Sequence, residues 1–465
     1  MQINSSYITA QGITPKILAV LISRHQAKRT RYEMLLRYYK GQHDILNREK
    51  LSDTAANNKL IANQAKYITD MSTAFFNGIP VEYSTSDEYD IAPIREIYQE
   101  QTISSLDSRL EKNASIYGRA YELVFANGER VPKPRSVLIP PHNAFIVYDD
   151  TAEHNKLFGV YYYNQTELDG SAGDAVVQVV DSAWQTTFRG RGVGFSNLEA
   201  DRCEKHYFGK VPMIEYMNND EGQGDFEQQK SLIDAYNILM SDRINDKEQF
   251  VDAILFLVNV MLDTETAEKL KTERILEAIP GAGENAKAEY LSKTLTEADV
   301  EILRKAIKED IQQYSMVPNL SDEKFAGNSS GVALLYKLLG FQQHVKNKEP
   351  LFAKGLRERF ELYNNFLAKR NGTSIIPVHK IDIKFSRNLP SNELELSQIV
   401  NNLKGTVSDE TLIELLPFVS NAKDELLKIQ KQKEEEANRR VDEEKKYMSA
   451  IDYDKTEKDI DNELK

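Results

Sequence analysis

The chain has 465 residues, of which 41% are hydrophobic and 28% are charged, a balance that indicates a globular protein with more than one structural unit. Its 72 acidic residues outnumber 59 basic ones, and the formal net charge of −13 disfavours a tight, sequence-independent grip on DNA. The one cysteine, Cys203, excludes both an internal disulfide and a zinc site built from the cysteines of one chain.

The first part of the chain predicts a mixture of helix and sheet. Helices are expected over residues 32–39 and 63–76, each followed by a glycine that ends it. Alternating or continuous apolar residues then predict strands over 120–125, 144–148, 159–163 and 175–180. We therefore expect an α+β region that is largely sheet up to about Tyr216.

From Asp225 the apolar residues recur at helical spacing and predict one long helix. The apolar run 250–261 at its end falls short of the ~20 residues that cross a bilayer, so we interpret it as buried in protein. A second helix is predicted from Thr294, where Glu297 completes the spacing of a capping box. It carries an apolar stripe formed by Val300, Leu303, Ile307, Ile311 and Tyr314.

The last third begins with a polar stretch, 319–331, which predicts an exposed loop. A long helix is expected over 332–369, interrupted at Gly340 and bent at Pro350. A strand over 381–385 and a helix over 393–430 follow. Residues 431–465 are so rich in Lys and Glu that they predict a solvated helix or a disordered tail.

Motifs for enzyme chemistry are hard to find in the sequence. There is no GxxxxGK[ST] phosphate loop and no HExxH motif, and the seven histidines are scattered singly. The acidic pairs Asp149–Asp150 and Asp242 with Asp246 could hold Mg²⁺, but no basic or nucleophilic partner is near them in sequence. We interpret Cys203 as structural and expect neither a metal nor a cofactor. Residues 1–11 lack the features of a secretory signal, so we expect the chain to stay in the cytoplasm, away from membranes.

Several segments together resemble the portal proteins of tailed bacteriophages, of the long-tailed siphovirus type. In the family's order they are Tyr38–Gly41, Asn57–Asn63, Gly78–Pro80, Tyr117–Tyr121, Pro140–Asp150 and Gly209–Tyr216. The most specific match is Gly224–Phe226 leading to Leu232–Asn237, Ser241–Asp242 and Asn245–Asp246. Each piece alone is weak, but their shared order covers about the first two-thirds of the chain.

The resemblance implies a multidomain α+β portal-type fold with a wing, a long helical stem, a small α/β clip and a helical crown. The expected divisions are a wing at 1–229, stem helices at 230–261 and 295–318, a clip at 262–294, a tunnel loop at 319–331, a long bent helix and a strand returning to the wing at 332–390, a crown at 391–440 and a charged tail at 441–465.

The function implied by the resemblance is structural rather than enzymatic. Portal subunits form a ring, usually dodecameric, at one capsid vertex of the virion, through which double-stranded DNA is packaged and ejected without sequence-specific contacts. The implied partners are the terminase large subunit, the major capsid and scaffolding proteins, and a head–tail adaptor. The ring would be assembled in the host cytoplasm.

Three groups of side chains are expected to carry this role. Stem packing is assigned to Leu232, Leu239, Val300, Leu303, Ile307 and Ile311. A channel wall that repels DNA is assigned to Asp242, Asp246, Glu309 and Asp310. The DNA-facing loop is assigned to Asn319, Lys324, Gly327, Asn328, Ser329 and Ser330.

Two other functions remain open at this point. The first is a metal-dependent enzyme acting on nucleic acid, such as a nuclease that uses Asp149 and Asp150 with Mg²⁺. The second is a cytoplasmic scaffold or adaptor whose long helices bind other proteins without closing into a ring. A cleavage assay separates the first from a portal protein, and native mass separates the second.

Overall fold

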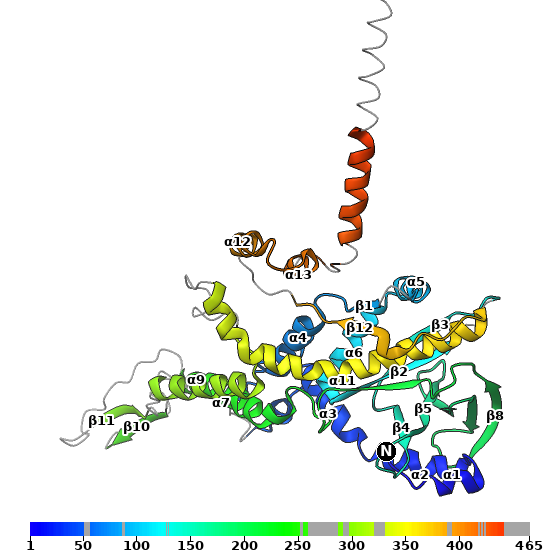
Figure 1. Ribbon diagram of the computed structural model, residues 1–465. Helices are drawn as coiled ribbons and strands as arrows, with labels where there is room; N and C mark the ends of the chain where they lie inside the picture. Colours follow the sequence, from blue (N-terminus) through cyan, green and yellow to red (C-terminus); the bar gives the residue numbers. More distant parts are fainter. Residues whose placement is uncertain are drawn as a thin grey trace, which may run out of the picture. The chain divides into compact units, whose positions relative to one another are not determined.

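The computed structural model describes residues 1–440 except 51–55, 86–88, 127, 129, 252–253, 259–286, 292–296, 320–330, 388–392, 417–418, 420–421 and 423–424. The chain divides into two compact units, which are described separately. The first unit contains residues 1–322 and 338–387, and the second contains 323–337 together with the chain from 388 onward. Helices and antiparallel sheets both contribute to the first unit (Figure 1).

The helices of the amino-terminal region are α1 (Ser6–Gln11), α2 (Pro15–Gln26), α3 (Arg29–Tyr39), the 3-10 helix η1 (Asp44–Asn47), α4 (Gln64–Asn77), α5 (Ala92–Glu100) and α6 (Ile103–Tyr117). The predictions over 32–39 and 63–76 are confirmed by α3 and α4. Asn63 caps α4 because its side chain accepts a hydrogen bond from the N–H of Lys66. The other four α-helices of this region were not predicted.

A meander of five antiparallel strands forms the larger sheet. Its members, in spatial order, are β4 (Ala144–Tyr148), β5 (Lys156–Thr166), β6 (Ala172–Val180), β7 (Trp184–Gly190) and β8 (Leu198–Lys205). Helix α2 packs on this sheet through Leu18, Leu21 and Ile22. The strands predicted over 144–148, 159–163 and 175–180 are confirmed by β4, β5 and β6.

A smaller antiparallel sheet has the order β3–β2–β9, with β2 at Arg119–Ala126, β3 at Pro134–Ile139 and β9 at Met213–Met217. Strand β2 confirms the prediction over 120–125. It follows α6 directly, because Gly118 takes a left-handed conformation with φ of 83° that ends the helix. This position puts α6 against β2 and α4.

Two helices and a two-stranded sheet form the next part of the first unit. After the 3-10 helix η2 (Glu227–Gln229), α7 (Lys230–Val251) and α9 (Glu297–Ser315) lie side by side (Figure 1). Strands β10 (Ile254–Val258) and β11 (Lys287–Leu291) pair antiparallel. The expected extension of the first helix to residue 261 is therefore wrong, because its short apolar run pairs as a strand. Residues 294–296 of the expected capping box lie outside the described residues.

The longest helix is α11 (Gly331–Asn371), whose 41 residues confirm the prediction of a long helix over 332–369. Neither Gly340 nor Pro350 interrupts it, and Pro350 lies exposed on the solvent side. After the 3-10 helix η3 (Val378–Lys380), strand β12 (Ile381–Lys384) pairs antiparallel with β1 (Glu82–Thr85). This strand confirms the prediction over 381–385.

The main core lies where α4, α6 and α11 meet. Phe76 of α4 and Phe352 of α11 make an edge contact with ring centroids 5.2 Å apart. Leu110 of α6 and Leu356 of α11 are fully buried in the same cluster. None of the helices in the described part of the chain is long and apolar enough to cross a membrane.

The second unit contains α12 (Glu393–Leu403), α13 (Asp409–Glu414) and a helical stretch at 425–440. The uninterrupted helix expected over 393–430 is therefore wrong. Gly405 has φ of 84° and turns the chain after α12, and the Ser408 side chain then accepts a hydrogen bond from the N–H of Thr411 to cap α13. The tail at 441–465 lies outside the described residues.

Candidate functional site

An extended segment, residues 56–63, is fixed along α7 by side chains on one face of that helix. Three backbone N–H groups, two residues apart, each donate to a side chain one helical turn from the next. The bonds join Asn58 N to Asn245 Oδ1 at 2.7 Å, Leu60 N to Ser241 Oγ at 3.0 Å and Ala62 N to Asn237 Oδ1 at 2.9 Å. We call this arrangement the polar ladder.

The polar ladder is possible because the spacing of alternate residues in the extended segment matches the spacing of successive turns in α7. Two residues of extended chain advance about 6.6 Å, and four residues of helix advance about 6 Å. An antiparallel segment can therefore meet the same helix face at every turn. The residues in the ladder belong to the segments Asn57–Asn63, Leu232–Asn237, Ser241–Asp242 and Asn245–Asp246, so their occurrence together in the sequence has a structural reason.

Asn237 is the most enclosed member of the ladder, with 0% of its surface exposed. Its Nδ2 lies 2.7 Å from Nδ1 of His43, and Nε2 of His43 lies 3.0 Å from the carbonyl oxygen of Tyr38. Because that carbonyl can only accept, Nε2 donates and Nδ1 accepts from Asn237. Burial lowers the pKa of His43, in agreement with this neutral form.

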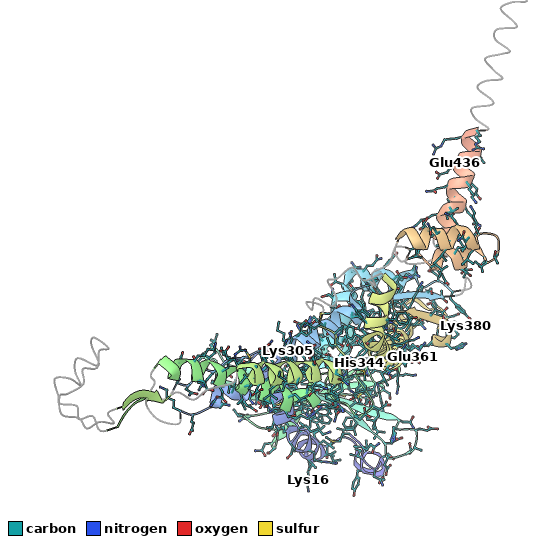
Figure 2. All side chains as sticks on the ribbon, turned by 90° about the vertical axis from the view of Figure 1, so that its left-hand side faces the viewer. Lys16, Lys305, His344, Glu361, Lys380 and Glu436 are labelled. Carbon is teal, nitrogen blue, oxygen red and sulfur yellow. The ribbon has the colours of Figure 1, made fainter. Side chains whose placement is uncertain are left out.

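Ion pairs join α7 to α9 and α7 to the segment before the ladder. Glu301 of α9 lies 3.1 Å from Arg243 of α7, and Asp242 lies 2.5 Å from Arg48. Lys305 marks α9 in Figure 2. Of the acids assigned to a channel wall, Asp242 is therefore already paired within the subunit. Asp246 and Asp310 are partly buried and Glu309 is exposed.

The residues assigned to stem packing occupy three different environments. Ile311 is buried at 1% exposure, and Leu232 and Ile307 are partly buried against the main core. Leu239 and Val300 are partly buried, whereas Leu303 is 50% exposed. Within one subunit, the apolar stripe expected on α9 is thus buried at Ile311 and exposed at Leu303.

Most of the expected DNA-facing loop lies outside the described residues. Asn319, its first residue, is partly buried. Lys324, Gly327, Asn328, Ser329 and Ser330 lie outside the described residues.

Of the residues weighed for metal or thiolate chemistry, Asp149 and His206 are held by contacts within the first unit, whereas Cys203, expected to be structural, is free and exposed. Asp149 accepts hydrogen bonds from the hydroxyl of Thr151 at 2.7 Å and from the backbone of Asn155 at 2.9 Å, which order the turn after β4. Nε2 of His206 lies 2.8 Å from the carbonyl oxygen of Asp181, so this ring is held by the backbone and not by Cys203. Among the residues that the structure describes, no group of three or more His, Cys, Asp or Glu side chains could hold a metal ion.

Two buried ionic clusters were missed in the sequence. Lys348 and Arg359 of α11 are 3% and 0% exposed, although both carry a charge. Lys348 binds Asp225 and Glu111, and Arg359 binds Asp107 and Glu122. The signal was present, because both cations fall on the helical spacing of the apolar residues Phe341, Val345, Phe352, Leu356 and Tyr363.

Comparisons with known proteins agree on one family. The profile described as "Phage portal protein, SPP1 Gp6-like" matches residues 18–439. The portal protein of Bacillus phage SPP1 is 22% identical over 425 residues, which is 85% of this chain and 82% of that protein. The portal protein of Clostridium phage phiCD119 is 27% identical over 228 residues, covering 47% of this chain and 48% of that one.

Solved structures with a similar arrangement come from gene transfer agent particles. A chain in the neck of an empty particle has a TM-score of 0.42 and 11% identity, covering 76% of this chain and 89% of its own length. A chain in the virion of the native particle has a TM-score of 0.39 and 10% identity, with the same coverages.

Proposed function

The chain belongs to the SPP1 Gp6-like family of phage portal proteins, and from this membership we propose that twelve copies close into the ring at one capsid vertex. The family is structural and not enzymatic, and its ring is the channel for packaging and ejecting the phage genome. The observation that carries the proposal is the match over residues 18–439, which includes the polar ladder and the α7–α9 pair.

The α7–α9 pair supplies a surface suited to ring closure. Ile302 and Leu303 of α9 are 66% and 50% exposed, and Ile238 of α7 is 46% exposed. A ring needs one heterologous interface repeated until the rotation closes, and exposed apolar side chains on a rigid helical pair favour such packing. We assign these residues to the contact between neighbouring subunits.

The remaining assignments follow the order of elements. We assign the wing to the α+β region up to η2, the stem to α7 and α9, the clip to the region of β10 and β11, and the crown to the second unit's helices. Double-stranded DNA is the cargo, and the net charge of −13 suits a wall that DNA passes without being trapped. The terminase large subunit, the major capsid and scaffolding proteins and the head–tail adaptor are the proposed partners, met during assembly in the host cytoplasm.

The direct test is to image the purified full chain by negative stain and to measure its ATP turnover. We expect rings with a central hole and no hydrolysis, because the sequence has no phosphate loop. A monomer that persists at micromolar concentration across a range of salt, or robust turnover by the protein alone, contradicts the proposal.

The loop at 319–331 has its own test, because a defect in DNA passage differs from a defect in assembly. Gly327→Pro and Ser329→Trp should leave rings intact and reduce the number of filled capsids. Lys324→Glu should act more weakly and depend on salt, since it changes one screened charge per subunit. Full packaging by both loop variants would show that this segment does not face the DNA.

A further inference from the structure

Helix α11 is joined to the rest of the first unit by two buried clusters of the same composition. Each has one cation from α11 and two carboxylates from elsewhere in the chain. Arg359 binds Asp107 at 2.6 Å and Glu122 at 2.8 Å, and all three side chains are 5% exposed or less. The second cluster lies three helical turns earlier, around Lys348.

The Lys348 cluster gathers groups from three other parts of the chain. Its Nζ lies 2.6 Å from Asp225, 3.2 Å from Glu111 of α6 and 2.9 Å from the hydroxyl of Ser72 of α4. The side chains of Lys348, Asp225 and Glu111 are 4%, 1% and 1% exposed. His344, one turn earlier on α11 and labelled in Figure 2, has its Nε2 3.6 Å from Asp225.

The charges in this cluster do not balance by themselves. Lys348 supplies one positive charge against two carboxylates, so one further proton is needed for neutrality. A surplus charge in a site closed to water is costly, and proteins avoid it by changing a protonation state. His344 is the further titratable group that acts on both Asp225 and Glu111. Glu111 and His344 are therefore the two places for the additional proton.

The hydrogen bonds favour Glu111 as the group that holds this proton. Asp225 accepts from Lys348, from the hydroxyl of Ser115 at 2.6 Å and from the amide of Asn218 at 2.8 Å, which suits an ionised carboxylate. Burial would raise the pKa of Asp225, but Lys348 and His344 lower it overall. Burial raises the pKa of Glu111 to about 7, despite the opposing charge of Lys348.

Among residues 336–349 of α11, fewer side chains are buried than in the second half of the helix. The buried positions there form a narrow stripe, namely Leu338, Phe341, Val345 and Lys348, and Glu349 pairs with Arg387, whereas most positions from Phe352 to Ala368 are buried. Pro350 has no N–H, so the helix also lacks one backbone hydrogen bond beside the cluster. A change in the charge of the Lys348 cluster should therefore act on the first half of the helix.

From this geometry we propose that Lys348, Asp225 and Glu111 form a proton-dependent latch that holds the first half of α11 on the body of the subunit. The latch is closed when the cluster carries its additional proton and is weakened when that proton is lost.

The direction of the pH effect follows from the two states of Glu111. The pKa of Glu111 is about 7 in the closed latch and near its ordinary value of 4.5 when the latch opens to water. The closed state thus binds more protons between these values, and its advantage falls as the pH rises from 4.5 to 7. Opening should become up to about tenfold more favourable per pH unit in this window and should level off above it.

Hydrogen exchange of the purified full chain between pH 5 and pH 8 tests the latch, with rates corrected for intrinsic amide chemistry. Amides of residues 341–348 should show the slope and the plateau. Glu111→Gln, which imitates the protonated group, should remove the slope. Asp107→Asn, the matched change in the Arg359 cluster, should leave the slope at 341–348 unaltered.

Two results would overturn the latch: exchange at 341–348 that is independent of pH after correction, or the same slope in Glu111→Gln as in the unchanged chain. The plateau is measured on the unchanged chain, so the test survives a variant that fails to fold. Exchange within α11 needs neither packaging nor ring closure. A chain that makes no rings but shows the slope would therefore refute the proposed function and support the latch.

Discussion

Replacing Asn237 with alanine is the sharpest test of the polar ladder. This side chain is fully buried and makes two hydrogen bonds, one accepted from the N–H of Ala62 and one donated to Nδ1 of His43. The substitution leaves the fully buried His43 and the partly buried Ala62 without their present bonds. We expect the segment 56–63 to separate from α7 more easily, and the subunit to lose stability.

The size of the effect can be worked from the burial of each partner. A buried polar group left without a partner, here His43, costs about 1–3 kcal/mol, and the bond to the partly buried Ala62 adds about 1 kcal/mol, so Asn237→Ala should cost about 2–4 kcal/mol. Ser241→Ala removes the bond that the hydroxyl accepts from Leu60 and the one that it donates to the carbonyl oxygen of Asn237. Leu60 is 38% exposed, so water can replace its bond, and we expect a loss of about 1 kcal/mol. Asp246→Ala, on the same helix, should stay within about 0.5 kcal/mol.

Hydrogen exchange of the peptide covering residues 56–63 reports this loss directly. Because about 1.4 kcal/mol corresponds to a factor of ten, Asn237→Ala should speed exchange at least about 30-fold, and Asp246→Ala should leave it near its original rate. Negative-stain images identify variants that still form rings. Equal exchange in Asn237→Ala and the unchanged chain would refute the view that the ladder holds this segment.

Three further predictions concern α9 and two glycines. Leu303→Asp should leave the subunit folded but reduce ring formation, because the side chain is 50% exposed, whereas Ile307→Asp should lower thermal stability itself, since it packs on the core; circular dichroism and native mass distinguish these outcomes. Gly118→Ala should reduce soluble yield, because a Cβ there would lie 2.0 Å from a backbone oxygen at φ of 83°. Gly355→Ala should give soluble protein with a lower melting temperature. Its Cβ would lie 2.4 Å from the ring of Tyr216, and moving that ring costs about 1–3 kcal/mol.

Periodicity in the sequence predicted elements in which the apolar residues recur at regular spacing. The strand alternation over 120–125 and the apolar spacing of α3 both led to elements at the right place. It failed at α6, whose buried face includes Asp107, Glu111 and Ser115 as well as leucines. A pattern that assigns charged residues to solvent cannot recognise such a face, because the groups that neutralise it come from a helix more than two hundred residues later.

The same reason limits what could be predicted of the candidate site. The almost wholly polar stretch after Met240 indicated only that the surroundings of the helix change there. In the structure, Ser241 and Asn245 face a neighbouring segment whose N–H groups need hydrogen-bond acceptors. The short run Ile254–Val258 fits a strand or a buried helix equally well, and only pairing with β11 decides between them. The resemblance in the ordered segments identified the family, because it compares residues without requiring their contacts.

The pairing of β1 with β12 affects how the subunit is made. Thr85 pairs with Ile381 and Glu82 with Lys384, so β1 must wait for nearly 300 further residues before its partner exists. At about 5–20 residues per second, a ribosome takes roughly 15–60 s to supply them. Arg359 likewise arrives long after Asp107 and Glu122, which stay without their counter-ion until then. The body of the subunit can close only when translation is nearly finished, and so a chain that stops early cannot offer a finished body for incorporation into a ring.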